Sequence, residues 1–487
     1  MLRKIRICLQ VVTITLVTLL LLGIGFRVHL WAGWVAKIQL VPAILAMSIV
    51  WLPILFAITL FGRIYCSVVC PLGIMQDIFS WIGGKFKKNR FSYAKNKIWL
   101  RLVVLVGFII SIIVGFAPVT TLIEPYSAYS RIVNSLFKPL YDLLNNWLAS
   151  IDATNDRYNF TEVQIWMRSV TTFVVAIATL VILGALAIWK GRLYCNTICP
   201  VGTVLGHLSR HSILRIQFDK DKCKSCGLCE KNCKAQAIDF KNGKVDYSRC
   251  VVCGDCLDKC KFDALHYTAK RPIAEPKPVD TERRAFLVGA AVAGTSAALA
   301  QAEMKVDGGL AVIEDKKAPK RQTPITPPGS VSARHMQKHC TACQLCVSSC
   351  PNNVLRPSTE FQHFMQPMMS FERGYCRPEC TRCSEVCPAG AIKPISREEK
   401  TNIHMGHAVW IKENCVVLTD GVSCGNCARH CPTGAIQMVD YEGPNGKVQV
   451  PAVDENKCIG CGACEHLCPA RPFSAIYVEG NEMHHTN

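Results

Sequence analysis

The chain has 487 residues, enough for several domains, and half of them are hydrophobic, which indicates a membrane-embedded part. Its formal net charge is +19. The basic residues gather beside apolar segments, as orientation in a membrane requires, and no pattern of base-stacking aromatic residues accompanies them, so we expect no nucleic-acid partner. The 29 cysteines come mostly in groups of four, which indicates metal centres and excludes a disulfide scaffold.

Four apolar runs fill the first part of the chain, and each can cross a bilayer core of about 30 Å as a helix. They cover residues 7–30, 38–61, 98–117 and 163–189. Basic residues precede the first run and follow the second and fourth, so we expect these ends in the cytoplasm. The connection 119–162 has fewer bases, which suits the outer side. The sequence therefore predicts a four-helix transmembrane domain over residues 1–210.

The second and fourth runs are each followed by the same short sequence, GRIYCSVVCPLG at 62–73 and GRLYCNTICPVG at 191–202. This repeat predicts two related helical hairpins. Cysteines four positions apart can share a helix face, so Cys66, Cys70, Cys195 and Cys199 together offer four thiolates, enough for one cluster or one zinc ion. The C-x3-C spacing is a loose metal signature, and reduced thiols in a tight turn are the alternative.

Residues 217–268 hold two cysteine quartets with the spacing C-x2-C-x2-C-x3-C. This spacing is typical of the bacterial two-cluster ferredoxin, an α+β fold in which each cluster takes three cysteines from one quartet and the fourth from the other. A zinc ribbon is the alternative, although zinc sites use pairs of cysteines. The predicted ligand sets are Cys223, Cys226, Cys229 and Cys260 for one cluster, and Cys250, Cys253, Cys256 and Cys233 for the other.

Residues 269–332 are rich in proline and charge, which predicts a linker. Within it, Arg283 and Arg284 precede a charge-free run, and segment 281–302 reads as a twin-arginine export signal. Such a signal suits a domain that is loaded with clusters before export, because its cysteines are then protected from oxidation. This fifth apolar segment is either retained as a tether or cleaved after Ala298-Leu299-Ala300.

The last block, residues 333–487, is predicted to be a second ferredoxin-like domain with four clusters. Its first and last quartets are regular and its two central quartets are irregular, which suggests nested pairing; sequential pairing is the alternative. With the first ferredoxin, this makes six 4Fe-4S clusters. The nested ligand sets are Cys340, Cys343, Cys346 and Cys468; Cys458, Cys461, Cys464 and Cys350; Cys376, Cys380, Cys383 and Cys431; and Cys415, Cys424, Cys427 and Cys387.

Clusters in series predict the transport of single electrons. The sequence has no C-x2-C-H haem site and no dinucleotide-binding or phosphate-loop signature. Quinol is the expected membrane donor, and its oxidation releases two electrons and two protons. His29 and Glu124 lie at the outer ends of predicted spans and are candidate proton acceptors, although solvated interface residues are the more common case.

The four spans, the GRxYC-x3-CP repeats and the two-cluster ferredoxin of residues 1–270 resemble NapH, the membrane ferredoxin-type subunit associated with periplasmic nitrate reductase. Residues 281–487, with the twin arginines and four quartets, resemble NapG and MauM. The resemblance implies a fused quinol dehydrogenase module in the bacterial inner membrane. Electrons would pass from the quinone pool to a periplasmic reductase or its electron-carrier subunit, with residues 190–282 in the cytoplasm and the C-terminal domain in the periplasm.

A redox-sensing or maturation factor for a periplasmic reductase is the competing interpretation, because some membrane regulators share the C-x3-CP repeats. Those regulators that carry a covalent flavin need a further extracellular domain, and the connection 119–162 leaves no room for one.

Overall fold

The computed structural model describes residues 2–24, 26–86, 91–154, 160–219, 222–269, 306–307, 311–312, 314–443 and 446–486. The twin-arginine segment 281–302, with Arg283 and Arg284, lies outside the described residues.

The helical domain occupies the first part of the chain, up to residue 209. Its helices are α1 (Leu2–Leu22), α2 (Phe26–Ala32), α3 (Trp34–Lys37), α4 (Leu40–Leu45), α5 (Trp51–Phe61), α6 (Tyr65–Val68), α7 (Pro71–Phe86), α8 (Ile98–Val114), α9 (Ala117–Ile123), α10 (Pro125–Ile132), the π-helix η1 (Val133–Phe137), α11 (Lys138–Thr154), α12 (Val170–Lys190), α13 (Leu193–Thr197) and α14 (Pro200–Ser209).

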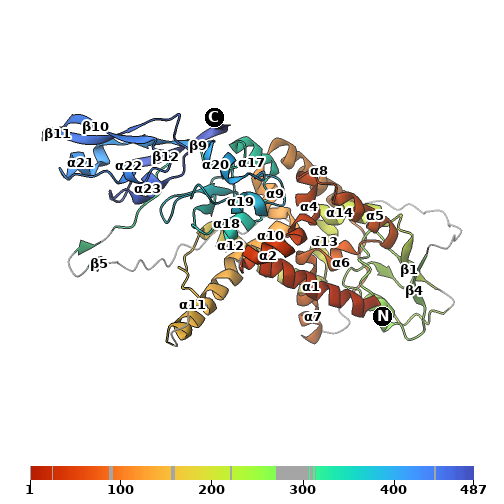
Figure 1. The fold of residues 1–487 in the computed structure, drawn as a ribbon. Coiled ribbons are helices and arrows are strands. Elements are labelled where there is room, and N and C mark those ends of the chain that lie inside the picture. The colour runs from red at the N-terminus through yellow and green to blue at the C-terminus, as the bar shows by residue number, and fades with distance from the viewer. Residues whose placement is uncertain are drawn as a thin grey trace, which may run out of the picture.

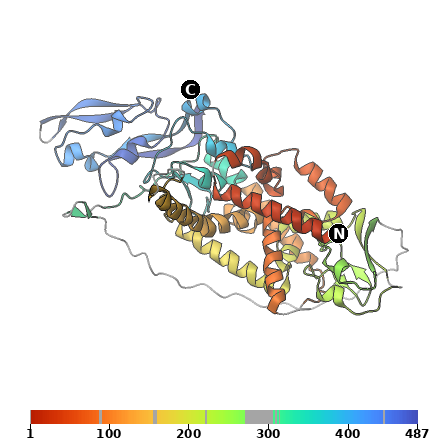
Figure 2. The same ribbon diagram turned by 60° about the horizontal axis from the view of Figure 1, so that its bottom comes forward.

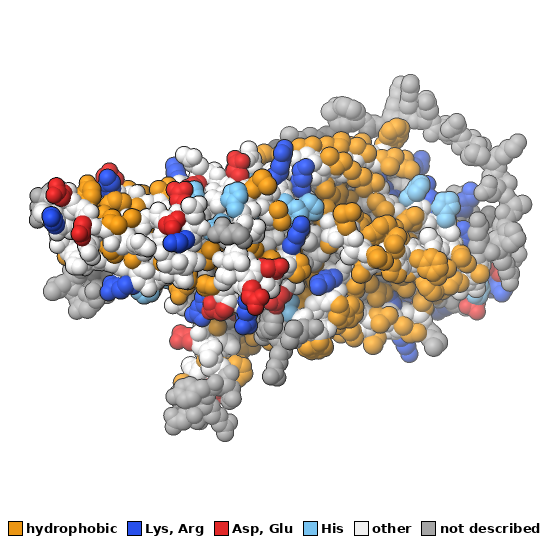
Figure 3. Space-filling view, turned by 45° about the horizontal axis from the view of Figure 1, so that its top comes forward, with side chains coloured by type: hydrophobic (Ala, Val, Ile, Leu, Met, Phe, Trp, Pro, Cys, Tyr) orange, Lys and Arg blue, Asp and Glu red, His pale blue; other side chains and the backbone are white. Residues whose placement is uncertain are grey.

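Two of these helices, α1 and α12, are long and apolar enough to cross a membrane, while the apolar helices α5 and α8 are shorter. Large apolar side chains stand exposed along them, for example Val103 and Ile113 on α8 and Val181 on α12. Figure 3 shows this apolar surface over the helical domain, whereas charged side chains are spread over the opposite end of the molecule. A hydrophobic surface of this extent is typical of a protein in contact with lipid or with another protein.

The second predicted span, 38–61, is not one helix. Its first half forms α4, the chain then turns through Met47 with a φ of 51°, and α5 begins at Trp51. Pro53 explains the break, because it lacks a backbone N–H and its ring clashes with the carbonyl one turn earlier, so proline is tolerated only in the first turn of a helix.

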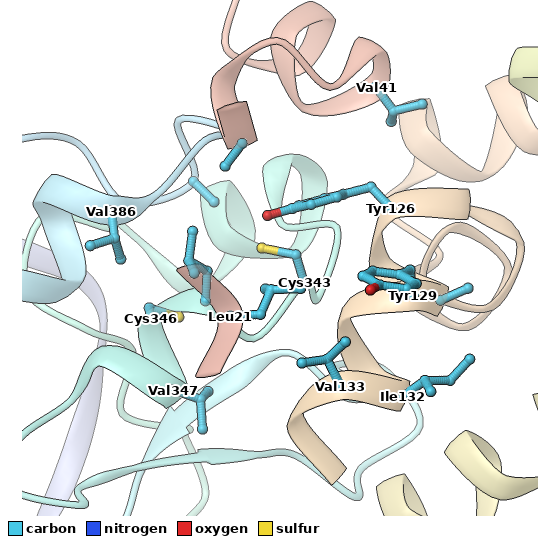
Figure 4. Close-up of a cluster of buried hydrophobic side chains, with 14 of the residues drawn as sticks. Leu21, Val41, Tyr126, Tyr129, Ile132, Val133, Cys343, Cys346, Val347 and Val386 are labelled. Carbon is cyan, nitrogen blue, oxygen red and sulfur yellow. The ribbon is translucent and has the colours of Figure 1, made fainter. Parts of the chain in front are cut away.

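The connection 119–162, for which the sequence predicts a place on the outer side but no secondary structure, is largely helical. Glu124 caps α10 by accepting hydrogen bonds from the backbone N–H groups of Tyr126 and Ser127, and Pro125 occupies the first helical position. The chain then continues through η1 into α11. Figure 4 shows Tyr126 of α10 beside Cys343 of the last domain, whereas α11 projects away from the body of the molecule in Figure 1.

The first cluster unit, residues 214–269, is a small α+β domain with two antiparallel strand pairs. Strand β1 pairs with β4, and β2 pairs with β3. Its elements are β1 (Leu214–Phe218), α15 (Leu228–Lys231), β2 (Ile238–Asp239), β3 (Lys244–Val245), α16 (Asp255–Lys259) and β4 (Leu265–Ala269).

The second cluster unit, residues 315–486, has antiparallel strand pairs joined by short helices; β9 pairs with β12 and β10 pairs with β11. Its elements are α17 (Ala333–His339), α18 (Leu345–Ser349), β7 (Leu355–Pro357), β8 (Pro367–Met369), α19 (Arg382–Val386), α20 (Arg397–Thr401), β9 (Ile403–Trp410), the 3-10 helix η2 (Lys412–Asn414), α21 (Val416–Thr419), α22 (Asn426–Arg429), β10 (Ile436–Gly443), β11 (Gly446–Val453), α23 (Ala463–Leu467) and β12 (Ile476–Thr486). Before it, β5 (Val306–Asp307) pairs with β6 (Ala311–Val312).

The predicted linker boundary at residue 332 is wrong, because residues 315–332 pack against this unit. Lys316 Nζ donates hydrogen bonds to the backbone carbonyls of Glu465 and His466 at 2.6 and 2.8 Å. Arg321 forms an ion pair with Glu465 at 2.6 Å, and Ile325 is fully buried. Long side chains thus fix a proline-rich segment that has no regular secondary structure of its own.

The two cluster units lie at opposite ends of the helical domain, the first on the right in Figure 1 and the second on the left; Figure 2 shows the same order from another direction. A single buried core runs through all three parts. At the second cluster unit it brings Leu21 of α1 and Tyr126 of α10 against Cys343 and Val347, as Figure 4 shows. The helical domain therefore positions the two units relative to each other.

Candidate metal centres

The eight cysteines of the first cluster unit gather in two groups. Cys223, Cys226, Cys229 and Cys260 line one small cavity. Cys233 lies within electrostatic reach of Cys250, Cys253 and Cys256. In each group three thiols come from one quartet and the fourth from the other, which is the grouping that the spacing predicts. Helices α15 and α16 pack against each other and so exchange the fourth cysteines.

In the second cluster unit the cysteines gather by sequential pairing, so the nested pairing is wrong. Cys350 lines one cavity with Cys376, Cys380 and Cys383. The thiol of Cys387 lies near those of the first quartet. Helix α18 packs against α19, and α22 packs against α23. The fourth cysteine of each quartet comes at or just after the end of one of these helices. Each packed pair of helices therefore brings the fourth cysteine of one quartet to the other quartet. The other two groups are Cys415, Cys424, Cys427 and Cys468, and Cys458, Cys461, Cys464 and Cys431.

The regular quartets share a loop in which the residues on both sides of the second cysteine have a positive φ. In the first quartet of the second unit these are Ala342 and Gln344, with φ of 56° and 58°. This conformation turns backbone N–H groups toward sulfur: the N–H of Ala342 donates to Cys340 Sγ at 3.3 Å. Donors of this kind favour the negatively charged thiolate. The irregular quartets do without this loop, and each pairs with a regular one.

Burial acts against ionisation of these thiols. It raises the pKa of Cys250, Cys343 and Cys461 to about 12. Four such thiols do not ionise together unless positive charge lies among them. Iron supplies that charge, and binding to it releases the thiol protons. The donor sets therefore fit iron–sulfur clusters.

The four cysteines of the repeats also come together, in what we call the four-thiol site. Cys66 and Cys195 lie on the short helices α6 and α13, while Cys70 and Cys199 precede α7 and α14. All four are free and no more than 6% exposed. Gln76 Nε2 donates to Cys195 Sγ at 3.3 Å, and the N–H of Gly202 donates to Cys199 Sγ at 3.3 Å.

Two fully buried arginines brace this site by crossing between the repeats. Arg63 of the first repeat donates to the backbone carbonyl of Cys195 at 3.4 Å. Arg192 of the second donates to the backbone carbonyl of Cys66 at 2.6 Å. Each arginine therefore reaches the carbonyl of the first cysteine of the other repeat, and the contact is reciprocal. Sequence spacing alone gave these arginines no role, although their equal position in the two repeats is a signal that marks them.

The last glycine of each repeat is required by close packing. A Cβ on Gly73 would overlap the carbonyl oxygen of Cys66, and one on Gly202 would overlap that of Cys195. The repeat tyrosines point toward the other end of the bundle: Tyr65 accepts a hydrogen bond from the N–H of Leu40 at 2.9 Å. The two copies of the repeat motif therefore pack closely against each other around the four thiols.

No group of three or more His, Cys, Asp or Glu is spaced to hold a single metal ion in the part of the chain that the structure describes. Around one zinc ion with bonds of about 2.3 Å, neighbouring sulfurs lie about 3.8 Å apart. The thiolates of a 4Fe-4S cluster bind separate iron atoms and stand farther apart. Both a zinc ion and a 4Fe-4S cluster take four thiolates, so the four-thiol site is a candidate for either.

A buried charge network joins the four-thiol site to the first cluster unit. Asp77 of α7 forms ion pairs with Arg192 at 2.8 Å, with Lys234 at 2.9 Å and with Arg6 at 3.2 Å. Burial alone would raise the pKa of Asp77, but these three cations outweigh it and hold the pKa below its usual range. Sequence reasoning missed Asp77, although an acidic residue inside an apolar helix is a recognisable signal.

Arg63 makes a second connection between the same parts. Its guanidinium contacts Cys66 Sγ at 3.8 Å and donates to the backbone carbonyl of Ser248 at 2.8 Å, two residues before Cys250. A single side chain therefore spans from the four-thiol site to the loop that carries the second group of the first cluster unit.

The two predicted proton acceptors lie at the other end of the bundle. Glu124 is 1% exposed and lies within electrostatic reach of the repeat tyrosines and of Cys343. His29 Nε2 lies 3.1 Å from Ser349 Oγ. Glu124 is therefore buried and His29 is partly exposed, and both lie beside the second cluster unit.

Comparison with protein families matches these regions. A family described as "4Fe-4S binding domain" covers residues 43–89 and 171–218, which contain the two repeats. A family described as "4Fe-4S dicluster domain" covers residues 339–416 and 422–471, each holding cysteines that the structure pairs. A second dicluster family covers residues 246–354, and a further 4Fe-4S binding domain covers residues 215–238.

Several characterised proteins are similar over part of the chain. The methylamine utilization ferredoxin-type protein MauM of Methylobacillus flagellatus is 31% identical over 165 residues, 33% of this chain and 70% of MauM. The ferredoxin-type protein NapF of Escherichia coli is 27% identical over 37% of this chain and all of NapF. The methylamine utilization ferredoxin-type protein MauN of Paracoccus denitrificans is 26% identical over 42% of this chain and 57% of MauN. The chain therefore belongs to the family of the ferredoxin-type protein MauM, and it is an iron–sulfur electron-transfer protein with several 4Fe-4S binding domains.

Proposed function

We propose that the protein is a membrane-bound quinol dehydrogenase module that passes electrons to a periplasmic reductase of the nitrate reductase type. In this proposal a NapH-like part and a NapG- or MauM-like part are fused in one chain. The 24 cysteines of the two cluster units bind six 4Fe-4S clusters. The observation that carries the proposal is the order of the cysteine groups along the molecule.

The groups follow one another from end to end. The second group of the first unit meets the four-thiol site through Arg63. On the far side, Glu124 lies within electrostatic reach of Tyr194, which precedes Cys195, and of Cys343. The Cys343 and Cys350 groups share a dicluster fold, and the N–H of Cys376 then donates to the carbonyl of Cys461 at 2.9 Å. A line of this kind supports electron transfer more readily than sensing, which needs one centre.

We further propose that the four-thiol site binds a seventh iron–sulfur cluster. Its thiols are buried and braced by reciprocal arginines, and the matched family over the repeats carries the 4Fe-4S description. A cluster here would bridge the gap between the two units, which is otherwise filled by the helical domain. Without it, the first cluster unit would have no redox partner in the part of the chain that the structure describes.

The proposed topology places the helical domain in the inner membrane, residues 190–282 in the cytoplasm and the C-terminal domain in the periplasm. The positions of the two cluster units at opposite ends of the apolar helices support it (Figure 1). Electrons would leave at the tip of the second unit, where Cys424 and Cys427 are partly accessible and are followed by the exposed Arg429 and His430.

Anaerobic membranes that contain the full chain test this function. Addition of a short-chain quinol should reduce the clusters, measured by the electron paramagnetic resonance of reduced 4Fe-4S centres. A Cys66→Ser/Cys195→Ser variant should lose about four iron atoms per chain. Its first-unit clusters should become unreachable by quinol, while those of the second unit are still reduced. The absence of any reduction in the unaltered protein would exclude the proposal.

Topology reporters provide an independent check. A reporter inserted before Arg283 should be active in the cytoplasm, and one inserted after Lys317 should be active in the periplasm. Two cytoplasmic signals would exclude a periplasmic electron acceptor.

A further inference from the structure

A cavity of about 730 Å³ lies between the helical domain and the second cluster unit. Its walls come from η1 and the start of α11, from residues 163–173 that lead into α12, and from the loop that holds Cys350. Ligand sites for small molecules usually enclose about 300–1,000 Å³. The cavity is thus large enough for an aromatic headgroup, and it directly adjoins a cysteine of one cluster group.

Three residues that line this cavity each carry a buried polar atom without a hydrogen-bond partner within the described part of the chain. The atoms are Asn134 Oδ1, Thr172 Oγ1 and Gln344 Nε2. Thr172 and Gln344 are 3% and 4% exposed. A buried polar group without a partner costs about 1–3 kcal/mol, and rotation of these side chains toward the cavity would let a polar ligand remove that cost. One acceptor, one hydroxyl and one donor suit a ring that carries oxygens on opposite sides.

The backbone at the cavity is unusual in the same place. Residues Val133–Phe137, which include Asn134, form the π-helix η1 between α10 and α11. Single turns of this kind are rare and often occur at functional sites, because they widen the helix and re-aim its side chains. The π-turn is therefore a second indication of a functional site at this cavity, independent of the unpaired polar atoms.

The remaining walls combine an apolar path with one carboxylate and with the basic side chains of Lys138 and Arg168. Leu140 lines the cavity and is 66% exposed, and Leu143, Leu144 and Trp147 continue an exposed apolar surface along α11. An isoprenoid tail can lie on this surface. Among the described residues that line the cavity, Asp142 is the single carboxylate, and it forms an ion pair with Lys138 at 3.5 Å.

We propose that this cavity binds the headgroup of quinol beside the Cys350 group, so that electrons enter at the second cluster unit. The inference rests on the proposed function for its substrate. Oxidation of one quinol breaks its two O–H bonds, gives the quinone and delivers two electrons, one at a time, to 4Fe-4S clusters as the oxidant. Two protons leave, and Asp142 is the carboxylate placed to accept one of them.

The test uses the full chain in lipid nanodiscs and a photoreactive benzoquinone with an isoprenoid tail. Mass spectrometry after illumination should find the label on peptides that contain residues 133–142, 163–173 or 344–357. Binding should also quench the fluorescence of Trp166, which lines the cavity. Thr172→Val removes the hydroxyl, and Asn134→Leu removes the side-chain amide, whose Nδ2 also donates to Ser130 Oγ at 3.4 Å. Both changes keep the side-chain shape, and each should raise the dissociation constant about five- to tenfold.

Matched controls lie on the same helices. Thr179→Val on α12 and Asn145→Leu on α11 remove polar groups that bond to nearby backbone, and neither residue lines the cavity. Both should bind the probe as the unaltered protein does. A headless isoprenoid alcohol at the same concentration should not compete; equal competition would mean an apolar slot for lipid and would overturn the proposal.

Reduction of the clusters by quinol is measured in the same preparation. This second measurement distinguishes failure of the cavity assignment from failure of the proposed function. If quinol reduces the clusters but the label lies elsewhere and both cavity variants bind normally, the cavity assignment is wrong and the proposed function stands. If the label lies in the cavity but the clusters stay oxidised, the cavity binds quinone and the proposed function is wrong. If the probe neither binds nor reduces the clusters, both are wrong.

Discussion

The two cluster units are attached to the helical domain by opposite means. The first is held by charges: Lys234 and Arg6 reach both Asp77 of α7 and Asp255 of the unit. The second is held by an apolar core around Leu21 and Tyr126, with few polar contacts (Figure 4). A charge network fixes one geometry, because each buried ion needs its partners, whereas apolar surfaces tolerate adjustment. The first cluster unit therefore has the more rigid connection to the helical domain and the second unit the more adaptable one.

The largest expected effect comes from breaking the charge network at its centre. Asp77→Leu leaves Arg6, Arg192 and Lys234 buried without their common partner. Removal of one member of a buried ion pair costs about 3–5 kcal/mol. The denaturant midpoint for loss of iron–sulfur absorbance should fall accordingly, and first-unit signals should be lost before those of the second unit. Simultaneous loss from both units would show that the two attachments are not independent.

Leu21→Ala breaks the apolar attachment instead. Leu21 is fully buried, and such a truncation costs about 2–5 kcal/mol because it leaves a cavity. Second-unit signals should now be lost first, and added salt should not change the effect. Leu143→Ala, at a side chain that is 63% exposed, is the control and should alter stability by less than about 0.5 kcal/mol.

Gly202→Ala tests the four-thiol site between the two attachments. A Cβ at Gly202 would overlap the carbonyl of Cys195, and overpacking of this kind costs about 1–3 kcal/mol. The variant should lose iron from this site while both cluster units keep theirs. Gly107→Ala on α8 is a matched control: no atom lies within 4 Å of its Cβ position, and it should be neutral or stabilise the helix by up to about 1 kcal/mol. Retention of all iron in Gly202→Ala would contradict the assignment.

The smallest effect is expected at the rim of the charge network. Arg3 pairs with Asp255 and Asp258 at 3.2 Å, but its side chain is 43% exposed. Exposed ion pairs contribute about 0–1 kcal/mol and are screened by salt. Arg3→Ala should therefore have a small effect in dilute buffer and none at high salt. A salt-independent loss as large as that of Asp77→Leu would mean that the network works as a single unit.

The sequence predicts the local chemistry better than the assembly. In the first unit, cysteine spacing is enough to assign the eight cysteines to two clusters, because each quartet can exchange its fourth cysteine only with the other. In the second unit, regular and irregular spacing suggests nesting, but the packing of α18 on α19 decides the pairing. Residues 315–332 read as a linker because proline-rich composition does not reveal that Lys316 and Arg321 bind distant backbone and Glu465.

The helices of residues 117–154 were missed for a similar reason. Their composition is polar in places, although Glu124 and Pro125 form a recognisable start signal: a side-chain acceptor followed by proline at the first helical position. The cavity beside Cys350 could not be predicted, because it is formed by three segments that are far apart in the sequence.

The reciprocal contacts of Arg63 and Arg192 make the two repeats equivalent halves of one site. Contacts in which residue i of one copy meets residue j of the other, and j meets i, are those of a two-fold homodimer. The single chain therefore contains the geometry of a symmetric dimer, in which each half supplies two of the four thiols. The halves differ in their further partners: Arg192 pairs with Asp77, while Arg63 contacts the carbonyl of Ser248.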